Sequence, residues 1–482
     1  MVSTGLRRLM GLGRDKALPA PDPLALLLNR TSFGITEADW TRARSLGFQG
    51  YLEEQLDPAS LDDSALEQAL ASRLPTLALD VPGLLTYAGN NANQFLPLTE
   101  LVGATLARQL FSRRQLFQVM VEFWSNHFSV FHLDGPVRFF KSYEDRIAVR
   151  PHALGKFRDL LRASAHSPAM LYYLDNYANI VGVAQENYAR ELMELHTLGA
   201  EGGYTEADVR EVARAFTGWT INGRATDGFA FVAGRHDTAA KSVLGEALPA
   251  GRGVEDGEAV LEKLATHPST ARFISTKLVR RFVADDPPQS LVDRLAAEFL
   301  ATDGDIKSLL RMLFGSSEFA ASADAKFKRP AELVMSMLRV TAPRAVGDYF
   351  RVINGRLTAM GQVPFQWDPP DGYPDRKDYW LNTTALLNRW NLGFDLVEGR
   401  LGPLLQIDES VLGGAARTPA ELVDRLGERI LHRPLDAADR DTLIAFAAGP
   451  NAASTILTKQ EREYAIVGLT GVMLASDYFQ YR

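Results

Sequence analysis

Apolar residues recur at intervals of three and four positions along almost the whole chain, and this spacing constrains the fold more than any other feature. Segments such as ITEADWTRARSLGFQGYLEEQL and STARFISTKLVRRFV show it, and Pro, Asp, Ser or Thr stands at the starts of such segments. Strand-like alternation is scarce, and the best case is DGFAFVAGRHD. We therefore predict a mainly α protein: a large multi-helical domain or domains, with a small β-hairpin or irregular insert near residues 225–245.

A Gly-rich stretch in the middle of the chain marks a weak boundary. We predict an N-terminal helical region over residues 20–225, a small strand and loop insert over 226–255, and a C-terminal helical region over 256–482. The longest helical run extends from Leu98 to Phe128, and we expect it to break into two helices near Ser112. Thr205, with Asp208 three residues later, predicts a capped helix start.

The composition excludes several partners. The 482 residues are 46% hydrophobic and 23% charged, which is typical of a soluble globular protein. The net charge of −7 gives no basic field for nucleic acid, and the short basic clusters RRQL and KLVRR are interpreted as helix faces. No window approaches the roughly 20 apolar residues of a membrane span.

The first residues, MVSTGLRRLMGLGRDK, lack the apolar core of about 7–15 residues that a signal peptide needs. We expect a cytoplasmic protein as the sequence stands. A periplasmic or exported protein whose leader had been removed would look the same.

The chain has no cysteine. Thiolate nucleophiles, disulfides and Cys-based metal sites are therefore excluded. A divalent metal would have to be held by His, Asp and Glu side chains.

The segment NYARELMELHTLGAEGGYTEADV concentrates polar groups among leucines. On an ideal helix Glu191 and Glu194 share one stripe, whereas His196 lies nearly opposite. Ion pairs of Arg190 with Glu186 and Glu194 explain the stripe structurally. The apolar remainder of the helix instead predicts burial, and a buried carboxylate must be paired, protonated or bound to metal.

Three other places carry candidate residues. His127 stands at a helix end in EFWSNHFSVF, where a hydrogen-bonded core histidine is the commoner role. HDTAAK supplies His236, Asp237 and Lys241 after the strand-like stretch, where a loop presents side chains to a cleft.

The third place is WDPPDGYPDRKDYW, which combines Trp367 and Tyr373 with carboxylates, a pattern that suits sugar rings. A proline-ordered loop packed on the helices explains the same residues without a ligand. Asp175 follows PAMLYYL, where a helix-ending role competes with substrate binding.

Several motifs occur in a specific order: FWSNHF, HSPAMLYYLDN, ENYARELMELHTLGAEGGYTEADVREVARAFTGW, HDTAAKSVLG, HPSTARFISTKLVRRFV, FKRPAELV, QVPFQWDPPDGYP and LLNRWNL. With them the chain resembles the bacterial family called domain of unknown function 1800, over nearly its whole length. The resemblance implies a large bacterial protein of a family with many exported members and no settled reaction. Relatives often carry a second histidine at the position of Ser125. The residues that fall inside the family's motifs are His127, Asp175, Asn187, Arg190, Glu191, Glu194, His196, His236, Asp237 and Lys241.

Three hypotheses follow. The first is a metal-dependent enzyme, a hydrolase or oxidoreductase acting on an unknown small molecule, with its site between helices. Its metal ligands are His127, Glu191, Glu194 and His236, its catalytic residues are Glu191, Glu194, His236, Asp237 and Lys241, and its substrate-binding residues are Arg190, Asp175, Trp367 and Tyr373. The second is a non-catalytic helical scaffold for a partner protein. The third is a carbohydrate-active or carbohydrate-binding protein that uses the aromatic and acidic loop 365–380.

Overall fold

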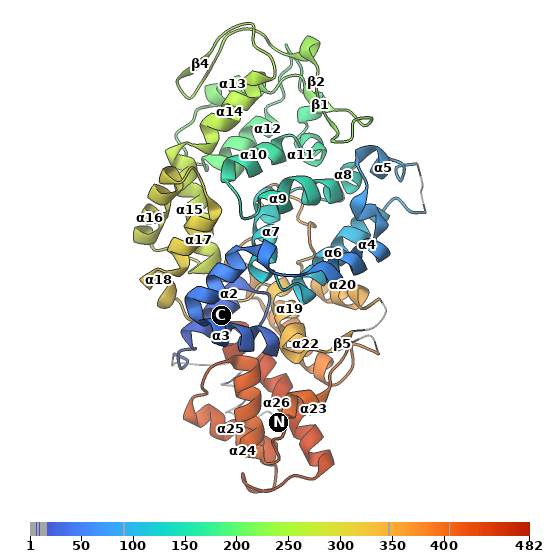
Figure 1. Ribbon diagram of the computed structural model, residues 1–482, viewed down its shortest axis with the longest axis vertical. Coiled ribbons are helices and arrows are strands. Elements are labelled where there is room, and N and C mark those ends of the chain that lie inside the picture. Colours follow the sequence, from blue (N-terminus) through green and yellow to red (C-terminus); the bar gives the residue numbers. More distant parts are fainter. Residues whose placement is uncertain (1–5, 7–8, 10–16, 90–91, 346–347, 404) are drawn as a thin grey trace.

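The computed structural model describes residues 6, 9, 17–89, 92–345, 348–403 and 405–482. The molecule is elongated and mainly helical, with residues near 230 at one end and the last long helices at the other (Figure 1). The prediction of a mainly α protein is confirmed.

The N-terminal half is a succession of short helices joined by tight turns. They are α2 (Pro23–Thr31), α3 (Glu37–Leu56), α4 (Ser64–Arg73), α5 (Val81–Leu85), α6 (Leu96–Phe111), α7 (Gln115–His127), α8 (Val137–Glu144), α9 (Arg150–His152), α10 (Phe157–Ala165), α11 (Pro168–Tyr173), α12 (Asn187–Glu191) and α13 (Glu206–Ala215). The break between α6 and α7 comes where it is predicted, because Ser112 adopts an extended backbone. The predicted cap of α13 is also present, since Thr205 and Asp208 form a capping box.

Two hairpins, not one, lie around the predicted insert, and the first begins before residue 225, within the region predicted to be helical. β1 (Trp219–Ile221) pairs with β2 (Phe229–Phe231), and β3 (Lys241–Val243) pairs with β4 (Glu246–Leu248), both antiparallel. In register, Thr220 faces Ala230 and Ser242 faces Ala247. A third small sheet joins β5 (Arg344–Ala345) to β6 (Leu405–Gln406).

Helices resume after the hairpins. They are α14 (Glu255–Ala265), α15 (Pro268–Phe282), α16 (Gln289–Ala301), α17 (Ile306–Phe314), α18 (Ser317–Ala320), α19 (Pro330–Thr341), α20 (Tyr349–Ala359), α21 (Lys377–Trp380), α22 (Thr383–Val397), α23 (Glu409–Gly413), α24 (Pro419–Leu426), α25 (Ala437–Ala448), α26 (Lys459–Ala475) and α27 (Asp477–Gln480). Every residue of α19 is buried, so this helix lies in the interior of the molecule.

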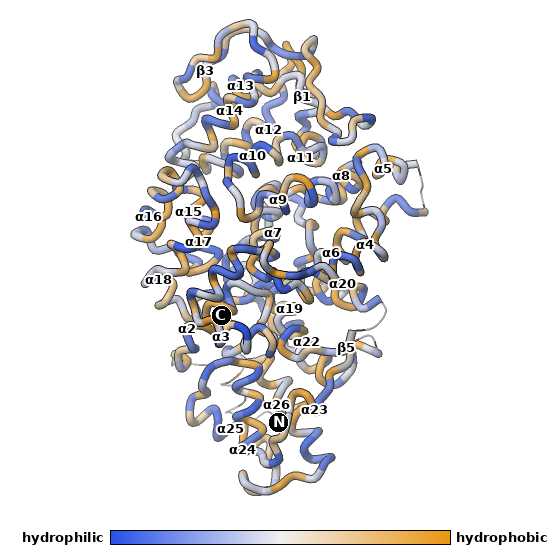
Figure 2. Tube along the Cα trace, viewed as in Figure 1, coloured by the Kyte–Doolittle hydropathy of each residue, from blue (hydrophilic) through white to orange (hydrophobic). Residues whose placement is uncertain are grey.

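One cluster of buried apolar side chains extends through the chain from Leu6 to Phe479 and therefore crosses both predicted boundaries. The division into three regions stays a prediction. Hydrophobic and hydrophilic residues alternate along the helices (Figure 2), as expected of helices with one buried face. Within the described part of the chain, no helix is long and apolar enough to cross a membrane.

The loop between α20 and α21 lies against the C-terminal end of α7. Asn126 accepts a hydrogen bond from the Tyr373 backbone N–H at 2.7 Å and donates one to the Tyr373 carbonyl at 3.0 Å. A Cβ atom on Gly372 would lie 2.1 Å from the Asn126 carbonyl oxygen, so only glycine permits this approach. The contact places the end of α7 beside the aromatic and acidic loop.

Candidate functional site

His236 and Lys241 are buried around Asp256 of α14. The Lys241 ammonium lies 2.6 Å from the Asp256 carboxylate, and the His236 Nε2 atom lies 3.3 Å from the same oxygen. The other ring nitrogen of His236 lies 2.8 Å from the Thr217 carbonyl. These bonds tie the hairpins to α13 and α14, and both ring nitrogens of His236 are engaged within the protein.

Asp237 points away from this group and pairs with Arg214 of α13 at 2.7 Å. That guanidinium holds the pKa of Asp237 below its usual value. The motif HDTAAK therefore has a clear structural role, which is to fasten a hairpin to the helices beside it.

The Glu191 and Glu194 side chains are half-buried, not enclosed as the apolar pattern predicts. Partial burial and the neighbouring Glu194 raise the pKa of Glu191. Arg190 pairs with Glu186 at 3.3 Å and with Glu206 at 2.7 Å, so its expected pairing with Glu194 is wrong. The polar stripe of this helix faces outward and its leucines face the core.

The second half of the same segment is a π-helix, Leu192–Thr197. Its wider turn is closed by a bond from the Leu198 N–H to the Met193 carbonyl at 2.8 Å. His196 is consequently carried into the core, where its ring packs 5.2 Å from that of Phe128. This agrees with the ideal helix, on which His196 lies nearly opposite Glu191 and Glu194.

His127 reaches His196 from α7. The Nε2 atom of His127 donates to the His196 carbonyl at 3.0 Å, while its Nδ1 atom has no hydrogen-bond partner among the described residues. Burial lowers the pKa of both imidazoles, that of His196 to about 3, and the nearby Lys277 lowers both further. Both rings are therefore neutral at neutral pH.

Three of the four predicted metal ligands have separate partners. His236 is bound to Asp256, His127 to His196, and Glu194 to the Tyr204 hydroxyl at 3.4 Å. In the described ranges, no three or more His, Asp or Glu side chains form a group that could hold a metal ion. The residues present do not fit a shared metal centre.

Several motifs do meet at another place, a cavity of about 290 Å³ between α7, α15 and the loop at 371–376. His127 and Asn126 come from FWSNHF, Lys277 and Arg281 from KLVRR, and Arg329 from FKRPAELV. With Arg280 and Arg376, five cationic side chains line the cavity, against the two carboxylates of Asp371 and Asp375. Below we call it the basic cavity.

Lys277 is the unusual member of the basic cavity. Within the described chain its ammonium group makes no hydrogen bond or ion pair. The ammonium nitrogen lies over the ring of Phe273, 5.4 Å from the ring centroid. Burial and the charge of Arg280 lower the pKa of Lys277 to about 8. The cavity therefore contains an amine that is partly neutral near physiological pH.

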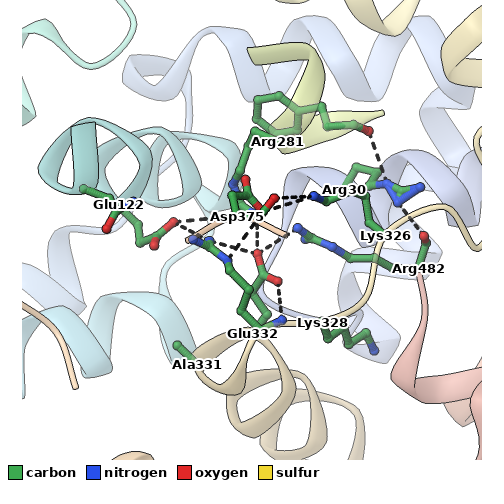
Figure 3. A network of polar contacts seen from close by, with 12 residues as sticks. Arg30, Glu122, Arg281, Lys326, Lys328, Ala331, Glu332, Asp375 and Arg482 are labelled. Carbon is green, nitrogen blue, oxygen red and sulfur yellow. Dashed lines mark hydrogen bonds and ion pairs between the residues drawn. The ribbon is translucent and has the colours of Figure 1, made fainter. Parts of the chain in front are cut away.

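The floor of the basic cavity is a buried ion network centred on Glu332 of α19 (Figure 3). Its carboxylate lies 2.7 Å from Arg482 and 3.1 Å from Arg329, and it also pairs with Arg281. Glu122 of α7 lies 2.9 Å from Arg329. The Nε atoms of Arg281 and Arg329 still lack hydrogen-bond partners within the described residues. Both Nε atoms are buried, and that of Arg329 lies 4.0 Å from the Asp375 carboxylate.

Asp375 joins the network to the loop. Its carboxylate lies 3.1 Å from the Lys326 ammonium, and Lys326 and Arg329 hold its pKa well below the usual value. Ion pairs therefore hold the loop at the edge of the basic cavity as well as the residues at its floor.

The aromatic residues of the loop pack on one another. The rings of Trp367 and Tyr373 are 4.9 Å apart, and the Trp367 indole N–H donates to Asp371 at 2.8 Å. The Tyr373 hydroxyl donates to the Val363 carbonyl at 2.8 Å. Asp175 is exposed, has a left-handed backbone at the end of α11, and accepts a bond from Asn187 at 3.2 Å. These contacts account for each residue structurally.

Sequence reasoning misses the basic cavity because it treats KLVRR as a helix face. The cluster lies on α15, where Leu278 and Val279 are buried and the basic side chains turn toward α7 and the loop. A usable signal is the occurrence of two basic motifs, KLVRR and FKRP.

Comparison with known proteins gives one match. A family model described as "Protein of unknown function (DUF1800)" matches residues 26–481. No curated protein and no solved structure matches the chain.

Proposed function

The chain belongs to the DUF1800 family of unknown function, and from the geometry of the basic cavity we propose that it binds, and acts on, a small molecule carrying a carboxylate or phosphate group. The observation that carries this proposal is Lys277, a cation facing a cavity without an acidic partner among the described residues. A protein cation that lacks a counter-ion is attracted to an anion from solution.

The surroundings of Lys277 favour the same ligand. Guanidinium groups bind carboxylate and phosphate through paired N–H donors, and Arg281 and Arg329 belong to the lining of the cavity. Because both arginines are fixed by Glu332 and Glu122, their side chains are ordered before a ligand arrives.

The size of the cavity limits the ligand to a small molecule. Its volume of about 290 Å³ lies at the lower end of the range for small-molecule sites, about 300–1,000 Å³. His127 adds a neutral imidazole to the wall.

Calorimetric titration with inorganic phosphate and with oxalate tests the proposal. We expect saturable binding to the wild-type chain and a loss of at least about tenfold in affinity in Lys277→Met, since one charge-assisted hydrogen bond contributes about 1.5–3 kcal/mol. Lys459→Met is the matched control, because this lysine is exposed and far along the chain. Absence of binding, or equal binding by Lys277→Met, would overturn the proposal.

Two alternatives keep specific support. The buried ion network of Figure 3 suits a rigid helical scaffold, because its ion pairs join separate segments of the chain. The carbohydrate hypothesis rests on Trp367, which is only partly buried. The metal-dependent enzyme stays a prediction, and the separate partners of His127 and His236 favour it less.

A further inference from the structure

We propose that Lys277 is a nucleophilic amine that forms an imine with the carbonyl group of a small oxoacid held in the basic cavity. This inference rests on the proposed anion-binding function and names both the ligand class and the chemistry of the same site. A 2-oxoacid combines a carboxylate for the arginines with a carbonyl carbon for the amine.

The placement of Lys277 separates it from lysines with structural roles nearby. Lys326 has the carboxylates of Asp285 and Asp375 beside it, and Lys241 has that of Asp256. In these lysines the ammonium group is occupied by an ion pair. Lys277 instead lies against the ring of Phe273 and lines open space.

Burial and the charge of Arg280 favour the neutral form of Lys277 over the opposing effect of Asp371 and Asp375. Burial and Arg280 lower its pKa to about 8, so roughly a tenth of the amine is unprotonated at pH 7. An amine flanked by another cation in a partly apolar pocket is a recurrent arrangement for lysines that react with carbonyl groups.

The cavity also contains a carrier for the protons of the reaction. The neutral amine attacks the carbonyl carbon, and the π electrons of the carbonyl move to its oxygen. A proton passes from nitrogen to oxygen to give a carbinolamine, which loses its hydroxyl group as water and leaves a carbon–nitrogen double bond. The Asp371 carboxylate, which lines the cavity, accepts and returns the proton. No oxidant or reductant is required.

The arginines at the wall hold the other end of the ligand. Arg281 and Arg329 line the cavity and are oriented by Glu332, and guanidinium groups suit a carboxylate. A carbonyl compound without an anionic group lacks this contact. Glyoxylate is therefore expected to react at Lys277 faster than acetaldehyde.

Borohydride trapping tests the inference on the full chain. Glyoxylate followed by sodium borohydride is expected to give one reduced adduct per chain, mapped to Lys277 by peptide mass spectrometry. Lys277→Arg keeps the charge without the nucleophile and should give no adduct, whereas Lys459→Arg should react like the wild type. Excess phosphate should slow the trapping at Lys277.

Two results would overturn the inference: no adduct at Lys277, or adducts spread equally over exposed lysines. Calorimetry separates this failure from that of the proposed function. If phosphate or oxalate binds with dependence on Lys277 but no adduct forms, only the imine is wrong. If neither anion binds and no adduct forms, both proposals are wrong.

Discussion

The Nε2 atom of His127 donates a hydrogen bond to the carbonyl oxygen of His196 at 3.0 Å, and this bond joins the two motifs that sequence reasoning singles out most strongly. The donation fixes the tautomer of His127, with its lone pair on Nδ1. The bond holds the end of α7 against the π-helical segment of His196. In the structure these histidines form a neutral, buried pair next to the basic cavity.

This pair makes stability depend on pH. The unfolded chain protonates each imidazole below about pH 6.5, but folded His196 does so only near pH 3, so the free energy of unfolding falls as the pH drops below 6.5. Each such histidine contributes a slope of about 1.4 kcal/mol per pH unit. His196→Gln should reduce the slope by that amount, measured by urea unfolding between pH 6 and 4. At pH 8, where His196 is neutral in both states, the same variant measures only the change in the free energy of unfolding that comes from altered packing. An unchanged slope would contradict a buried, neutral His196.

Removal of the central carboxylate of the ion network should strongly destabilise the fold. Glu332→Gln leaves Arg281, Arg329 and Arg482 buried without their common partner, and we expect a loss of about 3–5 kcal/mol in the free energy of unfolding. The matched control is Glu53→Gln, which breaks an exposed pair with Arg311 and should cost less than about 1 kcal/mol. Similar losses in the two variants would refute the network's central role.

The motif HDTAAK should stabilise the fold mainly through the contacts of His236 and Lys241 with Asp256. Asp256→Asn leaves the buried Lys241 ammonium without a carboxylate and should cost about 3–5 kcal/mol by urea unfolding at pH 7. Asp237→Asn breaks a partly exposed pair with Arg214 and should cost about 1 kcal/mol or less. The reverse order would show that Asp237, not Asp256, fastens the hairpin.

Substitution of Glu191 tests whether this residue is a metal ligand or a surface carboxylate without a metal. Its raised pKa means that the fold disfavours its charged form, so Glu191→Gln should slightly raise the free energy of unfolding at pH 7. Elemental analysis of both proteins after dialysis should give the same metal content. A stoichiometric metal that is lost in Glu191→Gln would instead support the metal-dependent enzyme.

Anion binding should weaken in alkaline solution. Oxalate stays doubly charged from pH 6 to 9, whereas Lys277, with a pKa of about 8, loses its charge across this range. The affinity for oxalate measured by calorimetry should therefore fall as the pH rises through 8. Lys277→Arg stays charged and should remove this dependence. A wild-type affinity independent of pH would exclude Lys277 from the anion site.

Much of the fold is predictable from local pattern. The break at Ser112 and the cap at Thr205 follow from side-chain chemistry within a few residues, and both occur as predicted. The strand Phe229–Phe231 lies in the predicted strand-like stretch, whereas its partner Trp219–Ile221 and the second hairpin were not predicted.

The site is less predictable because it depends on contacts between distant segments. Lys277 and Tyr373 meet across the basic cavity although about a hundred residues separate them in the sequence. The π-helix that carries His196 is likewise a result of packing, because the spacing of apolar residues does not encode a π-helical turn. The residue types of the motifs pointed to candidate site residues. Which side chains these residues contact is determined by the tertiary structure.

The most direct test of the anion site is a crystal structure of the protein grown with selenate, measured at the selenium absorption edge. We expect an anomalous peak inside the basic cavity, within hydrogen-bonding distance of the Lys277 ammonium and an arginine of its wall. Ordered selenate found only on the outer surface, with the cavity filled by water, would contradict the account.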